Sequence, residues 1–253
     1  MFSTAIVIPP CRRIADGLTT ANLGKPDYRR ALAQHAAYVQ ALAQCGLSVI
    51  QLPGDDNYPD ATFVEDTALV TPACAIITRP GAPSRRGETA AVKTALGKFY
   101  PHVEEVTAPG CVDAGDIMMA GTHFYIGLSK RTNREGAGQV AAILQKYGLT
   151  ASFVPLKQVL HLKSGLAYLE DNHLVAAGEF LQQPEFAAFD ILAVDDDERD
   201  AANCLWVNGR VLVPAGYPRS KKRIQDAGYE TIEVDVSEFQ KLDGGLSCLS
   251  LRF

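Results

Sequence analysis

Short apolar segments alternate with amphipathic segments along the whole chain. Apolar runs bounded by turn-forming residues predict strands at 4–8, 47–52, 68–71, 74–79, 103–106, 117–119, 122–127, 151–155, 173–177, 191–194, 203–207, 210–214, 230–234 and 246–250. Segments whose apolar residues recur every three or four positions predict helices at 26–45, 86–98, 132–147, 183–188 and 218–227. Many strands follow one another as hairpins, whereas a doubly wound parallel sheet needs a helix after nearly every strand.

A weak internal repeat favours a different α/β architecture. A hairpin followed by a short basic segment and a helix occurs with the hairpins at 63–79, 117–129 and 205–215. Repeats spaced by roughly 40–50 residues are typical of propeller-like arrays, and the chain holds about five such units when the two termini are counted together. We therefore predict a ring of ββαβ modules forming one domain over 1–253, with a small-molecule site at its centre.

The composition argues against several classes of partner. A net charge of -5 and a pI near 5.6 give no electrostatic reason to expect nucleic acid or an anionic membrane surface. No segment approaches the roughly 18 consecutive apolar residues of a membrane span. The apolar run at the N-terminus ends at Pro9, so it is expected to be a strand and not a signal peptide. We expect a cytoplasmic protein.

Six scattered cysteines without a C-x-x-C pair predict neither a zinc knuckle nor a redox dithiol. In a cytoplasmic chain they are expected to be free thiols. Cys248 is distinctive because it follows the pair Gly244 and Gly245, where the backbone can approach a ligand closely. It is either a nucleophile presented at the start of a strand or a buried core thiol.

A thiolate at neutral pH needs a base or a cation beside it, and His161 is the candidate. Apolar residues precede His161 and Lys-Ser-Gly follows it, as if a strand delivered it to a loop; a buried core histidine is the alternative. Asp113 and Asp116 lie in a glycine-containing turn. Either carboxylate could orient the histidine, and either could satisfy turn amides.

Charged residues elsewhere are candidates for a pocket that binds a cation and for a site that binds a carboxylate. Asp60, Glu65 and Asp66 lie within seven residues, and carboxylates are natural partners of a guanidinium. Strand alternation would place Asp60 and Asp66 on one face and Glu65 on the other. Arg85 and Arg131 occupy equivalent places in two repeats and could bind one carboxylate. The alternatives are surface acids and solvated helix starts.

From residue 16 onward the chain resembles the bacterial dimethylarginine dimethylaminohydrolases. The matching segments occur in order over essentially the whole chain: 16–20, 24–28, 63–66, 76–82, 84–88, 115–119, 131–133, 161–165, 243–245 and Cys248. Coverage of this extent by ordered motifs is highly specific. The resemblance implies a five-bladed α/β propeller of ββαβ modules, in agreement with the repeat.

The resemblance also implies roles for individual residues. Cys248 would be the nucleophile, His161 the general acid and base, and Asp113 the acidic partner of His161. The substrate guanidinium would meet Asp60, Glu65 and Asp66, and the substrate carboxylate would meet Arg85 and Arg131. Leu18 would lie on a lid loop, Leu242 would offer its backbone to the α-amino group, and Phe63 would complete the substrate-binding set. Close bacterial relatives carry glutamate in place of Asp113, which leaves Asp116 as a second candidate partner.

The implied reaction is hydrolysis of asymmetric dimethylarginine or monomethylarginine to citrulline and dimethylamine or methylamine. It would proceed through a thiouronium on Cys248 and would require neither metal nor organic cofactor. A homodimer is the assembly expected from relatives. The alternatives are an arginine deiminase, which is usually longer, an amidinotransferase, and an arginine-binding module without catalysis. Intact Cys248, His161 and Asp113 favour the hydrolase.

Overall fold

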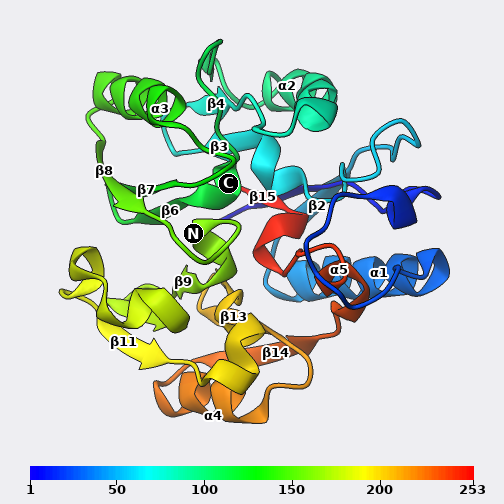
Figure 1. The fold of residues 1–253 in the computed structure, drawn as a ribbon, viewed down its shortest axis with the longest axis vertical. Coiled ribbons are helices and arrows are strands. Elements are labelled where there is room, and N and C mark those ends of the chain that lie inside the picture. The colour runs from blue at the N-terminus through cyan, green and yellow to red at the C-terminus, as the bar shows by residue number, and fades with distance from the viewer.

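A computed structural model describes residues 1–253 as a ring of five three-stranded sheets (Figure 1). The sheets are β3(Ala68–Val70)–β4(Ala75–Ile77)–β5(Val103–Glu105), β6(Ile117–Ala120)–β7(His123–Leu128)–β8(Thr150–Pro155), β9(Leu166–Tyr168)–β10(His173–Ala176)–β11(Asp190–Ala193), β12(Leu205–Val207)–β13(Arg210–Pro214)–β14(Glu230–Val234) and β15(Leu251–Arg252)–β1(Thr4–Val7)–β2(Ser48–Gln51). The predicted five-bladed α/β propeller is confirmed.

Each sheet joins an antiparallel pair to a parallel pair, such as β3–β4 and β4–β5. A parallel pair needs a crossover connection, which here is usually a helix on the rim of the ring. The crossover helices are α1(Tyr28–Gln44), α2(Thr89–Leu96), α3(Arg134–Lys146) and α4(Pro218–Asp226), and the short helix α5(Ser237–Gln240) follows β14.

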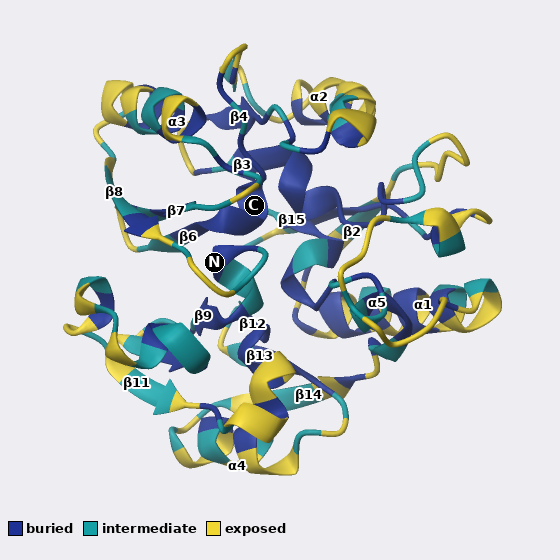
Figure 2. Cartoon of the chain, viewed as in Figure 1, coloured by how far each residue is buried: buried dark blue, intermediate teal, exposed yellow.

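The rim helices form because their sequences combine a cap with one apolar face. The Asp27 side chain accepts a hydrogen bond from Arg30 N at the start of α1. Tyr38 and Leu42 on the inner face of α1 are fully buried in a cluster with strand residues. Figure 2 shows the same division, with buried strands inside the ring and exposed helix surfaces outside.

The two ends of the chain close the ring. β15 pairs antiparallel with β1, in the register Ile6 to Leu251. This pairing confirms that the terminal segments together make one module. It also brings the segment that carries Cys248 to the centre of the ring, directly before the closing strand.

Two local predictions are wrong, and one strand was not predicted. The strand expected at 246–250 is a 3₁₀ turn over Ser247–Leu249, since this apolar segment is packed by other blades and does not pair. The helix expected at 183–188 is replaced by 3₁₀ turns at Gly178–Gln182 and Pro184–Phe186, and β9 was not predicted.

No helix of the chain has the length and apolar character that crossing a membrane would require.

Candidate active site

A small cavity at the centre of the ring is lined by most of the predicted site residues. Its lining comprises Leu18, Asp60, Phe63, Asp66, Arg85, Arg131, Leu160, His161, Leu242, Asp243, Gly244 and Cys248. These residues come from loops of several blades, because only the loops reach the centre. Of the predicted residues, Asp113 and Glu65 do not line the cavity.

Asp113 lies directly behind His161. Its Oδ2 is 3.0 Å from His161 Nε2, and its Oδ1 accepts a 2.8 Å hydrogen bond from Gly81 N. Asp113 has no exposed surface, so its orientation is fixed by these two contacts. Asp116 instead accepts hydrogen bonds from Ser129, Thr132 and the backbone of Leu162. Of the two candidate partners, Asp113 is the one that contacts the imidazole, while Asp116 holds the backbone beside it.

The surroundings of His161 favour its charged form. Burial lowers the pKa of His161, but the charge of Asp66, the hydrogen bond to Asp113 and the charge of Asp116 outweigh it and raise the pKa to about 9. His161 is therefore an imidazolium at neutral pH, and it can donate a proton to a leaving group.

Cys248 has the opposite tendency. Burial, followed by the negative charges of Glu65 and Asp66, raises the pKa of its thiol to about 11. Sγ is 3.5 Å from Gly245 N and 3.8 Å from Asn203 Nδ2, and both groups donate to it. In the protein without substrate Cys248 is thus a thiol at neutral pH, held where it can meet a cation in the cavity.

Two acidic residues of the cavity are held in fixed orientations. Asp66 Oδ2 pairs with Arg85 Nη1 at 2.6 Å, and Oδ1 accepts from Gly115 N at 3.0 Å. Burial alone would raise the pKa of Asp66, but the positive charges of His161 and Arg85 lower it by more, so the net shift is downward. Asp60 Oδ1 accepts from Leu18 N at 2.9 Å, and burial raises the pKa of Asp60.

The two arginines of the cavity are not equivalent. Arg85 is buried and donates to Asp66, to both oxygens of Glu88 and to the carbonyls of Asp60 and Phe63. The Arg131 guanidinium makes no hydrogen bond within the chain, and its nearest carboxylate, Asp113, is 3.8 Å away. Arg131 therefore has more N–H groups free for a ligand than Arg85 has.

Glu65 faces away from the central cavity. Its Oε1 pairs with Lys163 at 2.7 Å and with Arg252 at 3.1 Å, and all three residues line a separate, mainly apolar cavity of about 140 Å³. The segment 64–67 is a 3₁₀ turn and not a strand, yet Asp66 and Glu65 still lie on opposite sides. A contact between Glu65 and the substrate guanidinium stays a prediction.

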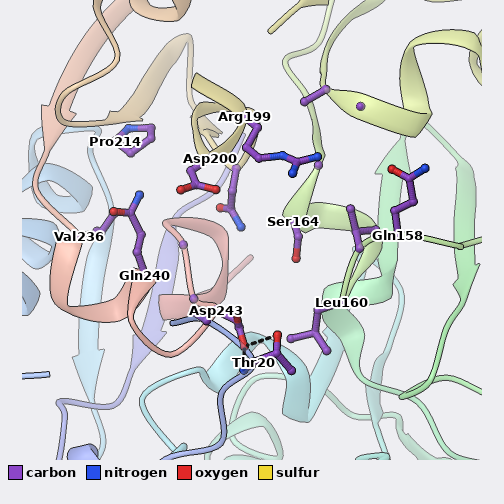
Figure 3. A pocket seen from close by; sticks show the side chains of 18 of the residues that line it. Thr20, Gln158, Leu160, Ser164, Arg199, Asp200, Pro214, Val236, Gln240 and Asp243 are labelled. Carbon is purple, nitrogen blue, oxygen red and sulfur yellow. Dashed lines mark hydrogen bonds between the residues drawn. The ribbon is translucent and has the colours of Figure 1, made fainter. Parts of the chain in front are cut away.

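The loop that carries Leu18 lines the cavity and is hydrogen-bonded to the segment 241–243. Thr19 Oγ1 donates to Lys241 O at 2.9 Å, and Thr20 Oγ1 donates to Asp243 Oδ2 at 3.1 Å. The latter contact stands at the edge of an adjoining cavity of about 290 Å³ (Figure 3). Asp243 was not singled out from the sequence, although it begins the Asp-Gly-Gly motif that precedes Cys248. Gly244 is required because a Cβ there would lie 2.2 Å from the Phe63 ring.

Asp66, Asp113 and His161 offer ligand atoms within 4.8 Å of one another and could in principle hold a metal ion. A metal would need a neutral imidazole, whereas the pKa of His161 is raised to about 9. Oxygen atoms of both carboxylates already accept hydrogen bonds from Gly115 N and Gly81 N. The cluster is better suited to an imidazolium and an organic cation.

Comparison with known proteins places these features in context. The family model for N,N dimethylarginine dimethylhydrolase, eukaryotic, matches residues 24–213. An N(G),N(G)-dimethylarginine dimethylaminohydrolase of Pseudomonas aeruginosa is 58% identical to this chain, and the alignment covers 100% of each of the two proteins. One of Streptomyces coelicolor is 37% identical, with 98% of this chain and 96% of that protein covered.

Solved structures agree with these similarities. DDAH from Pseudomonas aeruginosa, solved as a cysteine-to-serine mutant complexed with citrulline, has a TM-score of 0.99 at 57% identity over 100% of both chains. The N-terminal domain of a cyanobacterial arginine dihydrolase has a TM-score of 0.86 at 19% identity, covering 98% of this chain and 97% of that one. The second similarity shows the fold alone.

Proposed function

Since this chain belongs to the dimethylarginine dimethylaminohydrolase family, we propose that its central cavity binds an Nω-methylated L-arginine and that Cys248 attacks the guanidinium carbon. The enzyme hydrolyses asymmetric dimethylarginine or monomethylarginine to L-citrulline and dimethylamine or methylamine. The observation that supports the residue roles most strongly is the convergence of a thiol, an imidazolium and two carboxylates on one cavity.

Substrate contacts follow from the charges of the lining. The guanidinium lies against Asp66, with Asp113 behind His161 adding negative charge. Arg131, whose guanidinium makes no hydrogen bond within the chain, takes the substrate carboxylate, and Arg85 has one remaining N–H to assist. Asp60, expected at the guanidinium, is bonded to Leu18 N and in this proposal meets the α-amino group, together with the Leu18 loop and the backbone of Leu242. Phe63 packs beneath the chain of the substrate.

Glu65 belongs to the proposed site as an electrostatic neighbour. It neutralises Lys163 and Arg252, and its negative charge, outside the central cavity, raises the pKa of Cys248. The assignment of Glu65 to the guanidinium therefore gives way, in this proposal, to a role in holding the floor of the site.

Catalysis begins when the cationic substrate enters. Its positive charge beside Cys248 favours the thiolate, and the thiol proton is released to solvent. The thiolate attacks the guanidinium carbon and forms the C–S bond. His161, already an imidazolium, gives its proton to the methylated nitrogen as the C–N bond breaks, and the amine leaves. The product on Cys248 is an S-alkylthiouronium.

The second half of the reaction uses the neutral imidazole that His161 became when the amine left. His161 takes a proton from water, and the oxygen attacks the thiouronium carbon. The C–S bond then breaks and Cys248 leaves as a thiolate. The proton that remains on the attacking oxygen is lost to solvent, the sulfur takes one up from solvent, and citrulline is released. Asp113 stabilises the imidazolium in both steps. No step transfers electrons or requires a Lewis acid, so the residues suffice without a metal or organic cofactor.

The domain organisation, the cytoplasmic location and the assembly of the enzyme are also proposed. The whole chain, 1–253, acts as one catalytic domain, because strands from both ends complete one blade. All six cysteines are unpaired, as a reducing cytoplasm requires. A homodimer is the proposed assembly, and sedimentation of the purified protein would test it.

Citrulline release decides the assignment. The purified protein, without added metal, is incubated with asymmetric dimethylarginine and separately with arginine, beside a Cys248→Ala variant. We expect citrulline and dimethylamine from the methylated substrate and none from the variant. Faster ammonia release from arginine would make the protein a deiminase. A lack of product from both substrates, with binding retained, would support an arginine-binding module instead.

A further inference from the structure

Asn203 reaches the sulfur of Cys248 from a different blade. It lies between the 3₁₀ turns of Asp196–Ala202 and β12, whereas Cys248 lies in the turn before β15. Asn203 is 7% exposed, and its Nδ2 is 3.8 Å from Cys248 Sγ. Neither the spacing nor any motif in the sequence singles out this residue.

The orientation of the Asn203 amide follows from its other contact. Oδ1 accepts a 2.9 Å hydrogen bond from Ser247 N. A backbone N–H can only donate, so the amide oxygen must face Ser247 and the NH₂ group must face the sulfur. The side chain therefore presents an N–H donor to the candidate nucleophile.

The turn before Cys248 is shaped around this side chain. A Cβ on Gly245 would lie 2.4 Å from Asn203 Cγ, so only glycine allows the amide to approach. The N–H of the same glycine is 3.5 Å from Cys248 Sγ. Two N–H groups, one from the backbone and one from Asn203, thus point at the sulfur from adjacent positions.

These donors face a sulfur whose strongest charged influences are two carboxylates, opposed in part by Lys163. His161 lines the same cavity, and the Ser247 hydroxyl is 4.0 Å from the sulfur. Glu65 and Asp66 both disfavour the thiolate. An N–H that points at sulfur acts in the opposite direction, because a hydrogen bond to the charged form favours that form. The effect is strongest once sulfur is charged, since hydrogen bonds to an ionised acceptor are shorter and stronger.

We propose that Asn203 stabilises the thiolate of Cys248, donating through Nδ2 as sulfur attacks and again as it leaves the thiouronium. The proposal rests on Cys248 being the nucleophile and adds to it a residue of the reaction. Asn203 also lines the adjoining cavity of about 290 Å³, whereas Cys248 lines the central cavity.

Alkylation of Cys248 by iodoacetamide measures the thiolate directly. At pH 8 the rate is proportional to the small ionised fraction, so a one-unit rise in the pKa of Cys248 slows alkylation about tenfold. Peptide mass spectrometry follows Cys248 and the partly exposed Cys111 in the same sample, with Cys111 as the internal reference.

Asn203→Asp is the informative variant. It keeps an oxygen for Ser247 N but replaces the N–H donor by a carboxylate oxygen beside sulfur. We expect alkylation at Cys248 to slow about tenfold or more at pH 8 and to recover as the pH rises, with kcat/KM falling in parallel. Asn203→Ser, which loses volume but adds no charge, should shift the rate in the same direction and serves if the aspartate variant does not fold.

Asn208→Asp is the matched control. Asn208 bonds the backbone of Phe2 and Cys45 far from the sulfur, so its replacement disturbs structure without touching Cys248. It should lower the melting temperature and leave alkylation at Cys248 unchanged. An unchanged rate at Cys248 in folded Asn203 variants overturns the proposal, as does a slowing that does not depend on pH. Full turnover by Cys248→Ala would instead overturn the nucleophile assignment itself.

Discussion

Replacing Asp113 by Asn tests whether this carboxylate keeps His161 charged. Asp113 Oδ2 is 3.0 Å from His161 Nε2, and Gly81 N fixes the other oxygen. In Asp113→Asn the amide oxygen can still accept from Gly81, which turns the NH₂ group toward Nε2. An N–H donor at that place favours the neutral imidazole, so the pKa of His161 should fall.

The size of the effect follows from the raised pKa. A change from 6.5 to about 9 corresponds to about 3 kcal/mol in favour of the imidazolium. Asp66 and Asp116 remain in the variant and keep part of this stabilisation of the imidazolium. We expect a fall of about one to two pH units, or about 1.4–2.7 kcal/mol. At pH 8 the charged fraction of His161 then falls from about nine-tenths to between about a half and a tenth, and kcat should fall about 2- to 10-fold with it.

The same shift makes stability depend on pH. A histidine whose pKa is higher in the folded state stabilises the fold fully below its unfolded value and loses that contribution as the pH rises through the folded value. For His161 the window runs from 6.5 to about 9. The free energy of unfolding of the wild type should fall across this window, and that of Asp113→Asn should fall less.

Two measurements test the reasoning. NMR titration of the five histidines, with His161→Gln for assignment, gives the pKa, and citrulline release between pH 6.5 and 9 gives kcat. The ratio of variant to wild-type activity should rise as the pH falls. Asp116→Asn is the control, since Asp116 raises the pKa of His161 by its charge but makes no hydrogen bond to the imidazole, holding instead the backbone of Leu162 beside it. A pKa that stays near 9 in Asp113→Asn, or a larger fall in Asp116→Asn, refutes the assignment.

Three further substitutions separate the other parts of the site. Asp243→Asn weakens the bond that holds Thr20 and should raise KM about tenfold with less change in kcat, as steady-state kinetics would show. Arg131→Gln should raise KM for methylarginine by 10- to 100-fold, about 1.5–3 kcal/mol, yet leave a decarboxylated analogue unaffected; equal losses for both would exclude a carboxylate contact. Glu65→Gln leaves Lys163 partly unpaired and should lower the melting temperature without raising KM, whereas a raised KM would return Glu65 to the guanidinium.

Much of the fold could be predicted because its signals are local. Hairpins and amphipathic helices follow from side-chain periodicity over a few residues, and their recurrence predicts the number of blades. The elements that were wrong lack such a signal. The segment around Cys248 is a turn that other blades bury, and its side chains are therefore mostly apolar. In the sequence such a short apolar run cannot be distinguished from a buried strand.

The sequence by itself determined the ring, the family resemblance and the residue types that gather at its centre. Only the tertiary structure decided how those residues are paired. Asp113 contacts His161 across 48 residues, and Asn203 reaches Cys248 across 45. Glu65 and Asp66 are adjacent in sequence but face different cavities. The physical reason is that burial and charge at the centre arise from loops of separate blades, and their combined field exists only once the ring has closed.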